Sequence, residues 1–339
     1  MILHSSAQHN ARPPISVVIP TWQGRRYLPA CLAALRAQLT AADEIILVDN
    51  ASRDGAAAWA RQNAPDVRLL ELPVNRGFAG GTNAGLSIAR HPLLLLCNDD
   101  AMLEPGCLHA LYQTWQQSPR IGMVGGVLTF SRRPAIIASA GIAMQRDGVA
   151  IDRCIGQPVS TLPAAQQPIF GPSGALALLS RAMLDDIGLF AESFFSYLED
   201  ADLAWRARLR GWECWLAPQA RARHVVSASG SSLKQRWLAR NRLRVLLRCW
   251  PWPLLAACLP LIVRYDMLAL LFALYQGHTA MAAGRLAVLA ELPALLAQRQ
   301  SIQARRTAAL AELAPWLGPA PGPLATLRRH RAINHTKFG

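Results

Sequence analysis

The sequence of 339 residues is poor in charge and almost devoid of lysine. Only 17% of its residues are charged, which is low for a freely soluble protein, and Lys234 and Lys337 are its only lysines. The positive balance of +14 therefore rests on arginine, and it is concentrated at one end. Residues 233–339 hold 15 of the 35 basic residues and three acids, so they carry +12 and residues 1–232 carry +2. The basic charge thus describes a partner of the C-terminal third and not of the whole chain.

The sequence also lacks paired cysteine motifs. Its seven cysteines include no C-x-x-C pair and are odd in number, which argues against a disulfide framework or a cysteine zinc site. Several lie in apolar stretches, where cysteine behaves as a small hydrophobic residue. The N-terminus, MILHSSAQHNARPP, has no apolar stretch of signal-peptide length. We therefore expect a protein that stays in the reducing cytoplasm.

What the sequence does contain is an alternation of strand and helix patterns over its first hundred residues. Apolar strands are expected at residues 15–20, 44–49, 67–71 and 93–97, and helices at residues 25–38, 54–64 and 77–90. This order predicts an α/β fold with a Rossmann-like, mostly parallel sheet that helices cover on both faces. Ligands of such sheets bind beyond the C-terminal strand ends. Here those ends carry Thr21, Asp49 and the run Asn98-Asp99-Asp100.

Changes in composition divide the chain into four regions. The second half of the main domain is mixed, with a helix expected near residues 198–209 and short strands at 212–216 and 223–226. We expect a flexible tail at 1–14, one α/β domain at 15–232, a basic and apolar helical region at 233–315, and a second flexible tail at 316–339.

The basic helix KQRWLARNRLRVLLRC opens the third region. It carries arginines at successive i+4 steps, namely Arg236, Arg240, Arg244 and Arg248. A row of this kind is attracted to anionic lipid headgroups. We therefore expect this helix to face the cytoplasmic membrane surface.

An apolar helix follows at residues 254–275, after the helix-breaking sequence WPWP. Its length is about one bilayer thickness, but Arg264 and Asp266 lie near its middle and argue against a simple span. We expect it to lie in the membrane interface, which makes the protein peripheral. A spanning helix and a packed hairpin or dimer seam, and thus a homo-oligomer, are the alternatives.

Two acidic strand ends are candidates for ligand contact. In VDNASRDG, Asp49 is placed to accept from a base or a ribose hydroxyl, whereas Asn50, Ser52 and Asp54 are typical of turns and helix caps. In CNDDA, the pair Asp99-Asp100 has two interpretations: it caps a helix that begins near Pro105, or it holds a divalent cation that bridges a diphosphate. Carboxylates together with substrate phosphates suit Mg²⁺ or Mn²⁺.

A glycine-rich segment, NRGFAGGTNAG, occupies residues 75–85. Glycines before a helix let a phosphate approach backbone N–H groups, and they also permit tight packing of a helix on a sheet. The spacing is neither G-x-G-x-x-G nor a Walker loop, so it does not predict a dinucleotide or NTPase site.

Further acids open the segment FFSYLEDADLAWRARLRGW, in which Glu199, Asp200 and Asp202 precede three arginines. Acids at the start of a helix and arginines at its end match the helix dipole. The aromatic residues before the acids also offer an apolar wall that raises a carboxyl pKa and makes a usable base. His224, after the last expected strand, has a structural interpretation and a metal or phosphate-binding one.

Taken in order, ISVVIPTWQG, VDNASRDG, NRGFAGGTNAG, CNDDA, SYLEDADLAWR and a downstream histidine resemble the inverting family 2 glycosyltransferases of GT-A fold. The nearest group is the bacterial rhamnosyltransferase-like one that builds cell-surface polysaccharide, and the resemblance covers about residues 15–250. It implies a metal-dependent hexosyltransferase that uses Mg²⁺ or Mn²⁺ and a nucleotide-sugar donor. A dTDP-deoxysugar such as dTDP-rhamnose is favoured, with UDP- and GDP-sugars open. The acceptor it implies is a lipid-linked or glycan hydroxyl.

The resemblance also implies roles for single residues. Asp100 matches the last acid of the family's metal motif, with Asn98 in the place of the first acid, and His224 matches a histidine that joins the metal shell in some relatives. Asp200 matches the general base, with Glu199 beside it. The nucleotide-sugar contacts implied by the motifs are Pro20, Thr21, Trp22, Asp49, Asn75, Gly77, Asn83, Asn98 and Asp99. The helix with Arg240-Asn241 resembles the family's Arg-Asn helix.

Two departures from the family pattern keep other functions open. Ala191 stands where relatives often have an acid, and Asn98 lacks the charge of the acid it replaces. A non-catalytic nucleotide-sugar-binding relative is therefore one alternative. A basic nucleic-acid-binding protein is another, although the arginines adjoin apolar helices and no ordered nucleic-acid motif is present, so we expect no nucleic-acid partner. A nucleotidyltransferase is disfavoured because a Gly-rich, Lys-bearing signature is missing after residues 15–20.

Overall fold

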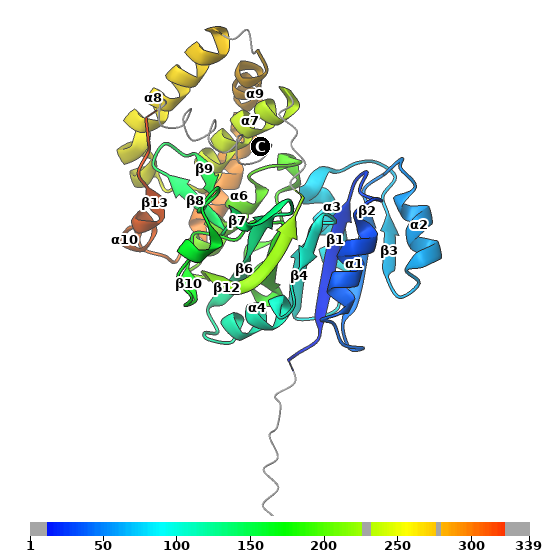
Figure 1. Ribbon diagram of the computed structural model, residues 1–339. Helices are drawn as coiled ribbons and strands as arrows, with labels where there is room; N and C mark the ends of the chain where they lie inside the picture. Colours follow the sequence, from blue (N-terminus) through cyan, green and yellow to red (C-terminus); the bar gives the residue numbers. More distant parts are fainter. Residues whose placement is uncertain (1–11, 226–231, 276–278, 323–339) are drawn as a thin grey trace, which may run out of the picture.

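A single twisted sheet forms the centre of the computed structural model, which describes residues 12–225, 232–275 and 279–322 (Figure 1). The strands run in the order β10-β12-β6-β11-β4-β1-β2-β3, with β5 beside β12 and β7 beside β6. Their bounds are β1 (Ile15–Thr21), β2 (Glu44–Asp49), β3 (Arg68–Glu71), β4 (Leu93–Cys97), β5 (Ala101–Leu103), β6 (Ile121–Phe130), β7 (Arg133–Ser139), β10 (Gln167–Pro168), β11 (Leu176–Ser180) and β12 (Glu213–His224).

The first half of the sheet is parallel, as the alternation of elements predicts. Strands β4, β1, β2 and β3 all run in one direction, while β11 is antiparallel to both β4 and β6. Because β4 lies at the centre of the sheet, all five of its residues are buried. The C-terminal ends of β1, β2 and β4 therefore meet at one edge, and the acidic residues lie there.

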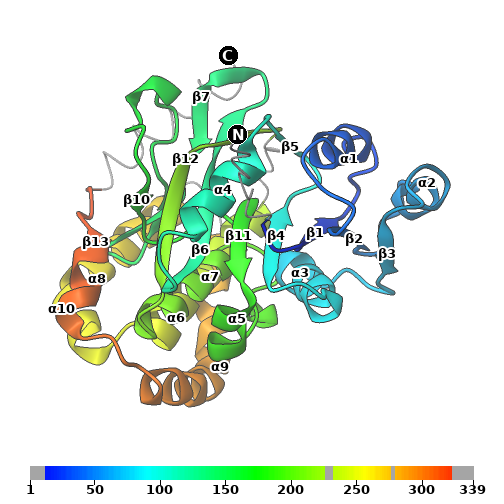
Figure 2. The same cartoon turned by 90° about the horizontal axis from the view of Figure 1, so that it is seen from below.

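Helices cover both faces of this sheet (Figure 2). One face carries α1 (Leu28–Arg36), α2 (Ala56–Asn63) and α4 (Cys107–Trp115), and the other carries α3 (Gly77–Ile88), α5 (Arg181–Ile187) and α6 (Glu199–Leu209). Strand β1 shows the division, since Ile15, Val17 and Ile19 pack on the α1 side and Val18 on the α3 side. The α/β fold expected from the sequence is confirmed.

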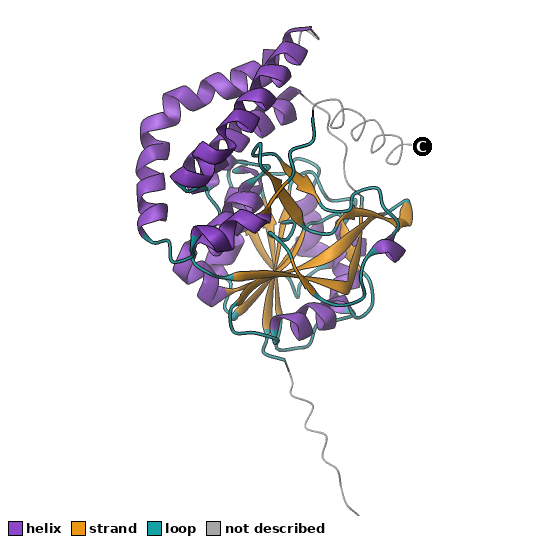
Figure 3. Cartoon of the chain, turned by 90° about the vertical axis from the view of Figure 1, so that its left-hand side faces the viewer, coloured by secondary structure: helices purple, strands orange, loops and turns teal. Residues whose placement is uncertain are grey.

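The C-terminal third is helical, and its helices are α7 (Ser232–Cys249), α8 (Trp252–Tyr275), α9 (Thr279–Ala304) and α10 (Leu310–Leu313). Helices α8 and α9 form a long hairpin that stands out from the α/β layers (Figure 3). Helix α7 packs between this hairpin and α6, and its residues Val245, Leu246 and Cys249 belong to the same hydrophobic core as the sheet. The GT-A layers and α7 thus share one core.

Three sequence expectations need correction. The strands expected at 212–216 and 223–226 are one strand, β12, which begins at Glu213 and ends at His224. Its pairing with β6 shifts register between Leu216 and Arg221, and Val226 lies outside the described residues. The tail does not begin at residue 316, because β13 (Leu317–Gly318) adds to a small sheet with β8 (Ile142–Gln145) and β9 (Ala150–Asp152).

At the other end of the chain, residue 12 is not part of a loose tail. Both nitrogens of the Arg12 guanidinium donate to the Asp43 carboxylate, at 2.7 and 2.6 Å. The remainder of the expected tail, residues 1–11, and residues 323–339 lie outside the described part of the chain. The remaining short helices are η1 (Val159–Thr161), η2 (Glu192–Phe194) and η3 (Ala314–Trp316).

The expectation that the arginine row of α7 faces lipid headgroups is wrong, because most of the row is buried and paired inside the protein. Arg240 and Arg244 both bind Glu291 of α9, and Arg248 binds Asp202 of α6 at 2.9 Å. The i+4 spacing put these arginines on one face, as expected, but that face is the one that packs on the rest of the chain. Arg236 is the exposed member of the row.

The buried pairs of Asp202 predict a large stability effect. Asp202 is fully buried and accepts from Arg206 and Arg248, each at 2.9 Å, and these arginines lower its pKa although burial alone would raise it. Replacing Asp202 by alanine leaves two buried guanidinium groups without a carboxylate, so we expect Asp202→Ala to lose about 3–5 kcal/mol of unfolding free energy. Urea denaturation followed by circular dichroism measures this.

The control is Glu71→Ala, which removes an exposed pair with Arg61 and should cost less than about 1 kcal/mol. Because the folded pKa of Asp202 is depressed, the wild-type advantage should be complete above the ordinary carboxyl pKa of about 4 and shrink as the pH falls below it. Equal stabilities of Asp202→Ala and the wild type near pH 7 would contradict this account.

Candidate active site

The ends of β1, β2 and β4 bring three of the predicted residues together. Thr21 and Asp49 are register partners across β1 and β2, and the Thr21 hydroxyl donates to the Asp99 carboxylate at 2.5 Å. All three side chains are largely buried, and Asp49 also accepts from the Ser52 N–H at 3.3 Å. Gly24 makes this contact possible, because a β-carbon there would overlap the Asp99 carboxylate and the Thr21 hydroxyl.

Asp99 has no arginine partner among the described residues. Its pKa is raised to about 6, chiefly because it is buried, and the neighbouring Asp100 adds to the rise while the Thr21 hydrogen bond opposes it. The cap interpretation of Asp99-Asp100 is wrong: α4 begins at Cys107 after Gly106, and no side chain caps it. These carboxylates therefore do not serve the helix that follows them.

His224 and Asp100 are brought together by the antiparallel pairing of β12 with β5. Their backbones lie next to each other, with His224 opposite Ala101, and the His224 Nε2 lies 2.9 Å from the Asp100 Oδ1. Asn98 lies beside this pair, with its Nδ2 3.5 Å from the His224 Nε2. The buried Oδ1 of Asn98 has no hydrogen-bond partner among the described residues.

This group fits a divalent cation as a partial ligand set. It offers a carboxylate, an imidazole and an amide oxygen that lacks a partner, and Mg²⁺ and Mn²⁺ commonly take few protein ligands and complete their shell with water and phosphate oxygens. No cluster of three acidic, histidine or cysteine ligands occurs within residues 12–225, 232–275 and 279–322. The protein part of such a site is thus small, as the resemblance implies.

The second acidic group lies at the N-terminus of α6. The Asp200 carboxylate accepts from the Gly174 N–H at 3.2 Å, and the next residue, Ala175, accepts from the Asn98 N–H at 3.0 Å. A two-residue backbone segment therefore joins Asp200 to the strand end that carries Asp100. Asp200 is thus linked through residues 174–175 to Asn98, which lies two residues before Asp100.

Asp200 and Glu199 both have raised pKa values. Burial raises the pKa of Asp200 to about 6, with a further contribution from Asp152 of β9. Burial and the neighbouring Asp200 raise the pKa of Glu199 well above its usual range, and one of its carboxyl oxygens has no hydrogen-bond partner among the described residues.

The acids in this region contrast with the other buried acids of the protein. Arg12 and backbone N–H groups hold the pKa of Asp43 at about 2 against its burial, and arginines lower the pKa of Asp202. Asp99, Glu199 and Asp200 have raised pKa values and no ion pair within the described residues. Buried carboxyl groups with raised pKa values mark candidate functional sites.

The glycine-rich segment packs against the loop before α6. A β-carbon at Gly77 would overlap the Phe195 carbonyl, so this glycine serves close backbone packing. Asn75 is half-buried and accepts from the Gly77 N–H at 2.8 Å. The Asn83 side-chain amide pairs with the backbone of Phe190. It donates to the Phe190 carbonyl at 2.9 Å and accepts from the Phe190 N–H at 3.0 Å.

The other residues of the first motif lie at the rim of the site. Pro20 is half-buried next to Thr21, and Trp22 is 58% exposed beyond the end of β1. An exposed tryptophan at a strand end is placed to cover an aromatic base.

Sequence reasoning missed two residues that shape the site. Asn50 is not a helix cap: its Nδ2 donates to the Gly77 carbonyl and its Oδ1 accepts from the Arg76 N–H, both at 2.8 Å, so it ties the end of β2 to the glycine-rich segment. Gly24 was not singled out either. Its signal was present, since it lies in the quoted motif ISVVIPTWQG, but only the position of Asp99 shows why a glycine is needed.

A helix-covered sheet with paired acids after its fourth strand and further acids at the N-terminus of α6 is the arrangement that the resemblance to GT-A glycosyltransferases implies. Residues 13–244 match the family model described as Glycosyltransferase like family 2. The chain therefore belongs to glycosyltransferase family 2, and the family resemblance drawn from its motifs is confirmed.

Relatives with names include two enzymes of cell-surface glycan synthesis. The N-acetylglucosaminyl-diphospho-decaprenol L-rhamnosyltransferase of Mycobacterium tuberculosis is 27% identical over 236 residues, which are 62% of this chain and 75% of that protein. The poly-beta-1,6-N-acetyl-D-glucosamine synthase of Staphylococcus epidermidis is 26% identical over 215 residues, 62% of this chain and 50% of that protein.

Among solved structures, a mannosyltransferase from Pyrobaculum calidifontis in complex with GDP-Man and Mn²⁺ has the same fold. The two share 18% identity with a TM-score of 0.52, over 83% of this chain and 87% of that one.

Proposed function

We propose that this protein is an inverting, divalent-metal-dependent hexosyltransferase. It moves a sugar from a nucleotide-diphosphate donor to a hydroxyl of a lipid-linked or glycan acceptor in the synthesis of a cell-surface glycan. A deoxyhexose such as rhamnose is the first candidate, because the relative from Mycobacterium tuberculosis is named as an L-rhamnosyltransferase. The observation that carries the proposal is the pair of hydrogen bonds that links Asp200 to Asn98, two residues before Asp100, through residues 174–175.

Asp200 acts as the general base in this proposal. Its carboxylate takes the proton of the acceptor hydroxyl as that oxygen attacks the anomeric carbon. The new carbon–oxygen bond forms on the face opposite to the bond that breaks, so the anomeric configuration inverts and the nucleoside diphosphate leaves with the electron pair. Burial keeps the base near a pKa of about 6, which suits proton transfer at neutral pH.

The donor lies along the ends of β1, β2 and β4. Thr21 and Asp49 meet the nucleoside, Trp22 covers it, and Asn75 and Gly77 line the approach of the diphosphate. Asp100, His224 and Asn98 hold Mg²⁺ or Mn²⁺, which when bound neutralises the charge of the departing diphosphate. The unpaired Oδ1 of Asn98 and the close contact of Asp100 with His224 support this assignment.

The base assignment predicts a selective loss of transfer. Asp200→Asn removes the proton acceptor but keeps the shape, so we expect transfer to fall about 10²–10⁴-fold with nucleotide affinity nearly unchanged. In the wild type, kcat should rise through a pKa of about 6 and be lost below it, because only the ionised carboxylate accepts a proton. Product formation and nucleotide titration across pH 5–8 measure both.

The matched control is Asp185→Asn, which neutralises an exposed acid outside the site and should leave rate and pH profile unchanged. Full turnover by Asp200→Asn would remove Asp200 from the mechanism.

The metal assignment predicts opposite effects of two substitutions. Asp100→Ala should weaken Mn²⁺ binding at least about 10-fold, because it removes the one charged protein ligand, and Asn98→Asp should strengthen it by adding a carboxylate. Electron paramagnetic resonance of Mn²⁺ with dTDP, UDP or GDP measures this without turnover, and the tightest nucleotide identifies the donor class. Unchanged Mn²⁺ affinity in Asp100→Ala would move the metal elsewhere.

We also propose that the α8/α9 hairpin attaches the enzyme to the inner face of the cell membrane. Both helices are long and apolar enough to cross a bilayer, yet little of either is buried in the protein. Large apolar side chains are exposed along α8 at helical spacing, namely Leu259, Val263, Met267, Leu271 and Leu274. A continuous exposed stripe of this kind suits a helix that lies in the interface.

The charge in the middle of α8 is consistent with this attachment. Asp266 is not alone in an apolar helix: it binds Arg242 of α7 and Arg285 of α9, each at 2.9 Å. Most arginines of α7 are paired with groups inside the protein. The proposed attachment therefore depends on apolar contact with the membrane rather than on charge.

The apolar stripe predicts vesicle binding that tolerates salt. Met267→Asp combined with Leu271→Asp should weaken binding to vesicles of phosphatidylcholine and phosphatidylglycerol at least about 30-fold, since each side chain contributes about 2 kcal/mol when buried. Sedimentation with vesicles at 0.1 and 0.5 M NaCl measures this, and Val74→Asp, an exposed apolar position on the α/β domain, is the control.

Loss of binding at 0.5 M NaCl would show that charge, not the stripe, holds the protein. If the protein does not bind vesicles but forms a dimer that the two substitutions disrupt, the apolar stripe of α8 is an interface between two copies of the chain.

The nucleic-acid alternative has little support, because Arg240, Arg244 and Arg248 of the basic row are paired inside the protein. One result would identify the protein as a non-catalytic relative instead: the wild type would neither transfer sugar nor hydrolyse the donor.

A further inference from the structure

The segment that leads into the base has an unusual backbone. Phe195, Tyr197 and Leu198 have positive φ angles of 63°, 73° and 66°, although none of them is glycine. Each such residue costs on the order of 1–3 kcal/mol and persists only where its surroundings hold it. The segment ends at Leu198, and the next two residues are Glu199 and Asp200. The direction of the Asp200 side chain therefore depends on what holds residues 193–198.

One side chain makes three hydrogen bonds to this segment. Asn241 of α7 is completely buried, and its Nδ2 donates to the carbonyls of Phe194 at 3.0 Å, Ser196 at 3.0 Å and Tyr197 at 2.8 Å. These carbonyls converge on one point because the left-handed residues turn them inward. A single amide in the right place thus satisfies groups that an ordinary loop would expose to water.

The opposite side of the segment is held by the glycine-rich motif. The Phe195 carbonyl accepts from the Ala79 N–H and the Ser196 hydroxyl accepts from the Phe78 N–H, each at 3.1 Å. The Phe195 ring stacks on Trp237 of α7 with its centre 5.3 Å away. Residues 193–198 therefore lie between the start of α3, on the donor side, and α7.

Helix α7 is in turn fixed by the hairpin. Glu291 of α9 binds both Arg240 and Arg244, the neighbours of Asn241 on its helix, and the Arg244 guanidinium also donates to the Ser193 carbonyl. At the far end of α7, Arg299 of α9 donates to the Leu247 carbonyl at 2.8 Å and to that of Trp250.

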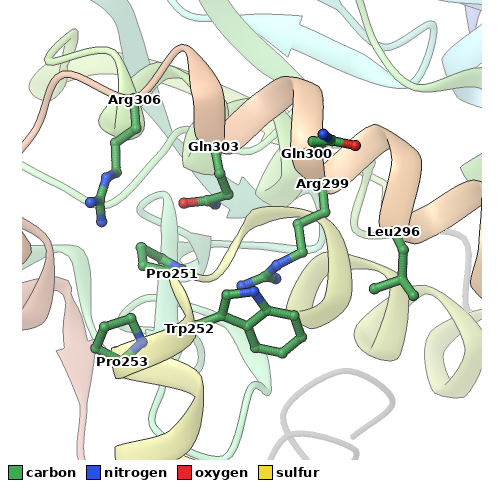
Figure 4. Close-up of a pocket in the computed structure, with 8 residues that line it drawn as sticks. All are labelled: Pro251, Trp252, Pro253, Leu296, Arg299, Gln300, Gln303 and Arg306. Atoms are coloured by element: carbon green, nitrogen blue, oxygen red, sulfur yellow. The ribbon is translucent and has the colours of Figure 1, made fainter.

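Figure 4 shows Arg299 next to the Trp252 ring, over which its guanidinium lies at 3.7 Å, beside a pocket of about 400 Å³. Helix α9 therefore holds α7 at two places.

We propose that Asn241 is a positioning residue for the Asp200 base, and that Glu291 of the hairpin holds the helix that presents it. This role rests on the proposed transfer reaction. The hairpin then has a second task besides membrane attachment: it completes the geometry of the base. Within the described residues no hydrogen bond joins Asn241 itself to the expected donor residues, although residues 193–198 pack against Gly77. We therefore expect a larger effect on proton transfer than on donor binding.

The ionisable groups that act on Asp200 are Glu199 on its own helix and Asp152 on β9. No arginine pairs with it within the described residues. Loosening residues 193–198 would admit water to Asp200 and lower its pKa toward the usual value, because burial is the main cause of the rise.

The test compares Asn241→Leu, which removes the amide at similar volume, with Arg236→Gln on the exposed face of the same helix. Hydrogen exchange of peptides covering residues 193–198 should speed at least about 10-fold in Asn241→Leu, with β4 peptides unchanged. kcat should fall about 10–100-fold, KM for the donor should stay within about 3-fold, and the acid limb of kcat should move to lower pH. Arg236→Gln should match the wild type.

Glu291→Gln serves if Asn241→Leu fails to fold, and it should change the same quantities in the same direction by a smaller factor. Unchanged exchange of residues 193–198, or faster exchange with an unchanged kcat, would overturn the positioning role. A rise in KM for the donor in place of the fall in kcat would also overturn it. If the wild type itself transfers no sugar, the proposed function fails, and that result is distinct because the exchange measurement needs no substrate.

Discussion

The arginine–carboxylate pairs of this protein, and the acids left out of them, determine both its architecture and its site. Buried carboxylates are costly unless a cation neutralises them, and the chain meets this cost with arginine at Asp43, Asp202, Asp266 and Glu291. At the C-terminal edge of the sheet, the acids have no arginine partner within the described residues. Asp99 and Asp200 are half-buried with raised pKa values, and Asp100 lies beside His224. A cation from outside the chain and a proton from an acceptor are the natural partners of such groups, which is the chemistry of metal-assisted sugar transfer.

The same pairs join the C-terminal helices to the catalytic half. Helix α7 carries arginines that bind α6 on one side and α9 on the other, so it connects the base helix to the hairpin. The positive charge of the C-terminal third is therefore largely internal, and the exposed property of the hairpin is its apolar surface. One region thus serves as a structural support for the base and as a candidate membrane contact. Both roles follow from which side chains face inward: the arginines do, and many of the leucines of α8 do not.

Sequence patterns predicted the elements of the first hundred residues closely, because strands buried in a parallel sheet are short, apolar and end in polar residues. The positions of β2 and β4 agree to the residue. Patterns could not tell that the arginine row faces the protein, since a row at i+4 spacing is the same for lipid and for carboxylate partners. They also could not place Asn50 or Asn241, whose roles depend on carbonyls from distant segments. The meeting of Asp100 with His224 needed the pairing of β5 with β12, which local spacing does not contain.

The most direct test of the account is a crystal structure of the protein with a nucleoside diphosphate and Mn²⁺, with the metal located by its anomalous scattering. The account predicts one manganese peak within ligand distance of the Asp100 carboxylate and the diphosphate. It also predicts that the side chain of Asp200 faces the sugar position from the other side of residues 174–175. A manganese peak or a diphosphate bound away from the ends of β1, β2 and β4 would contradict it.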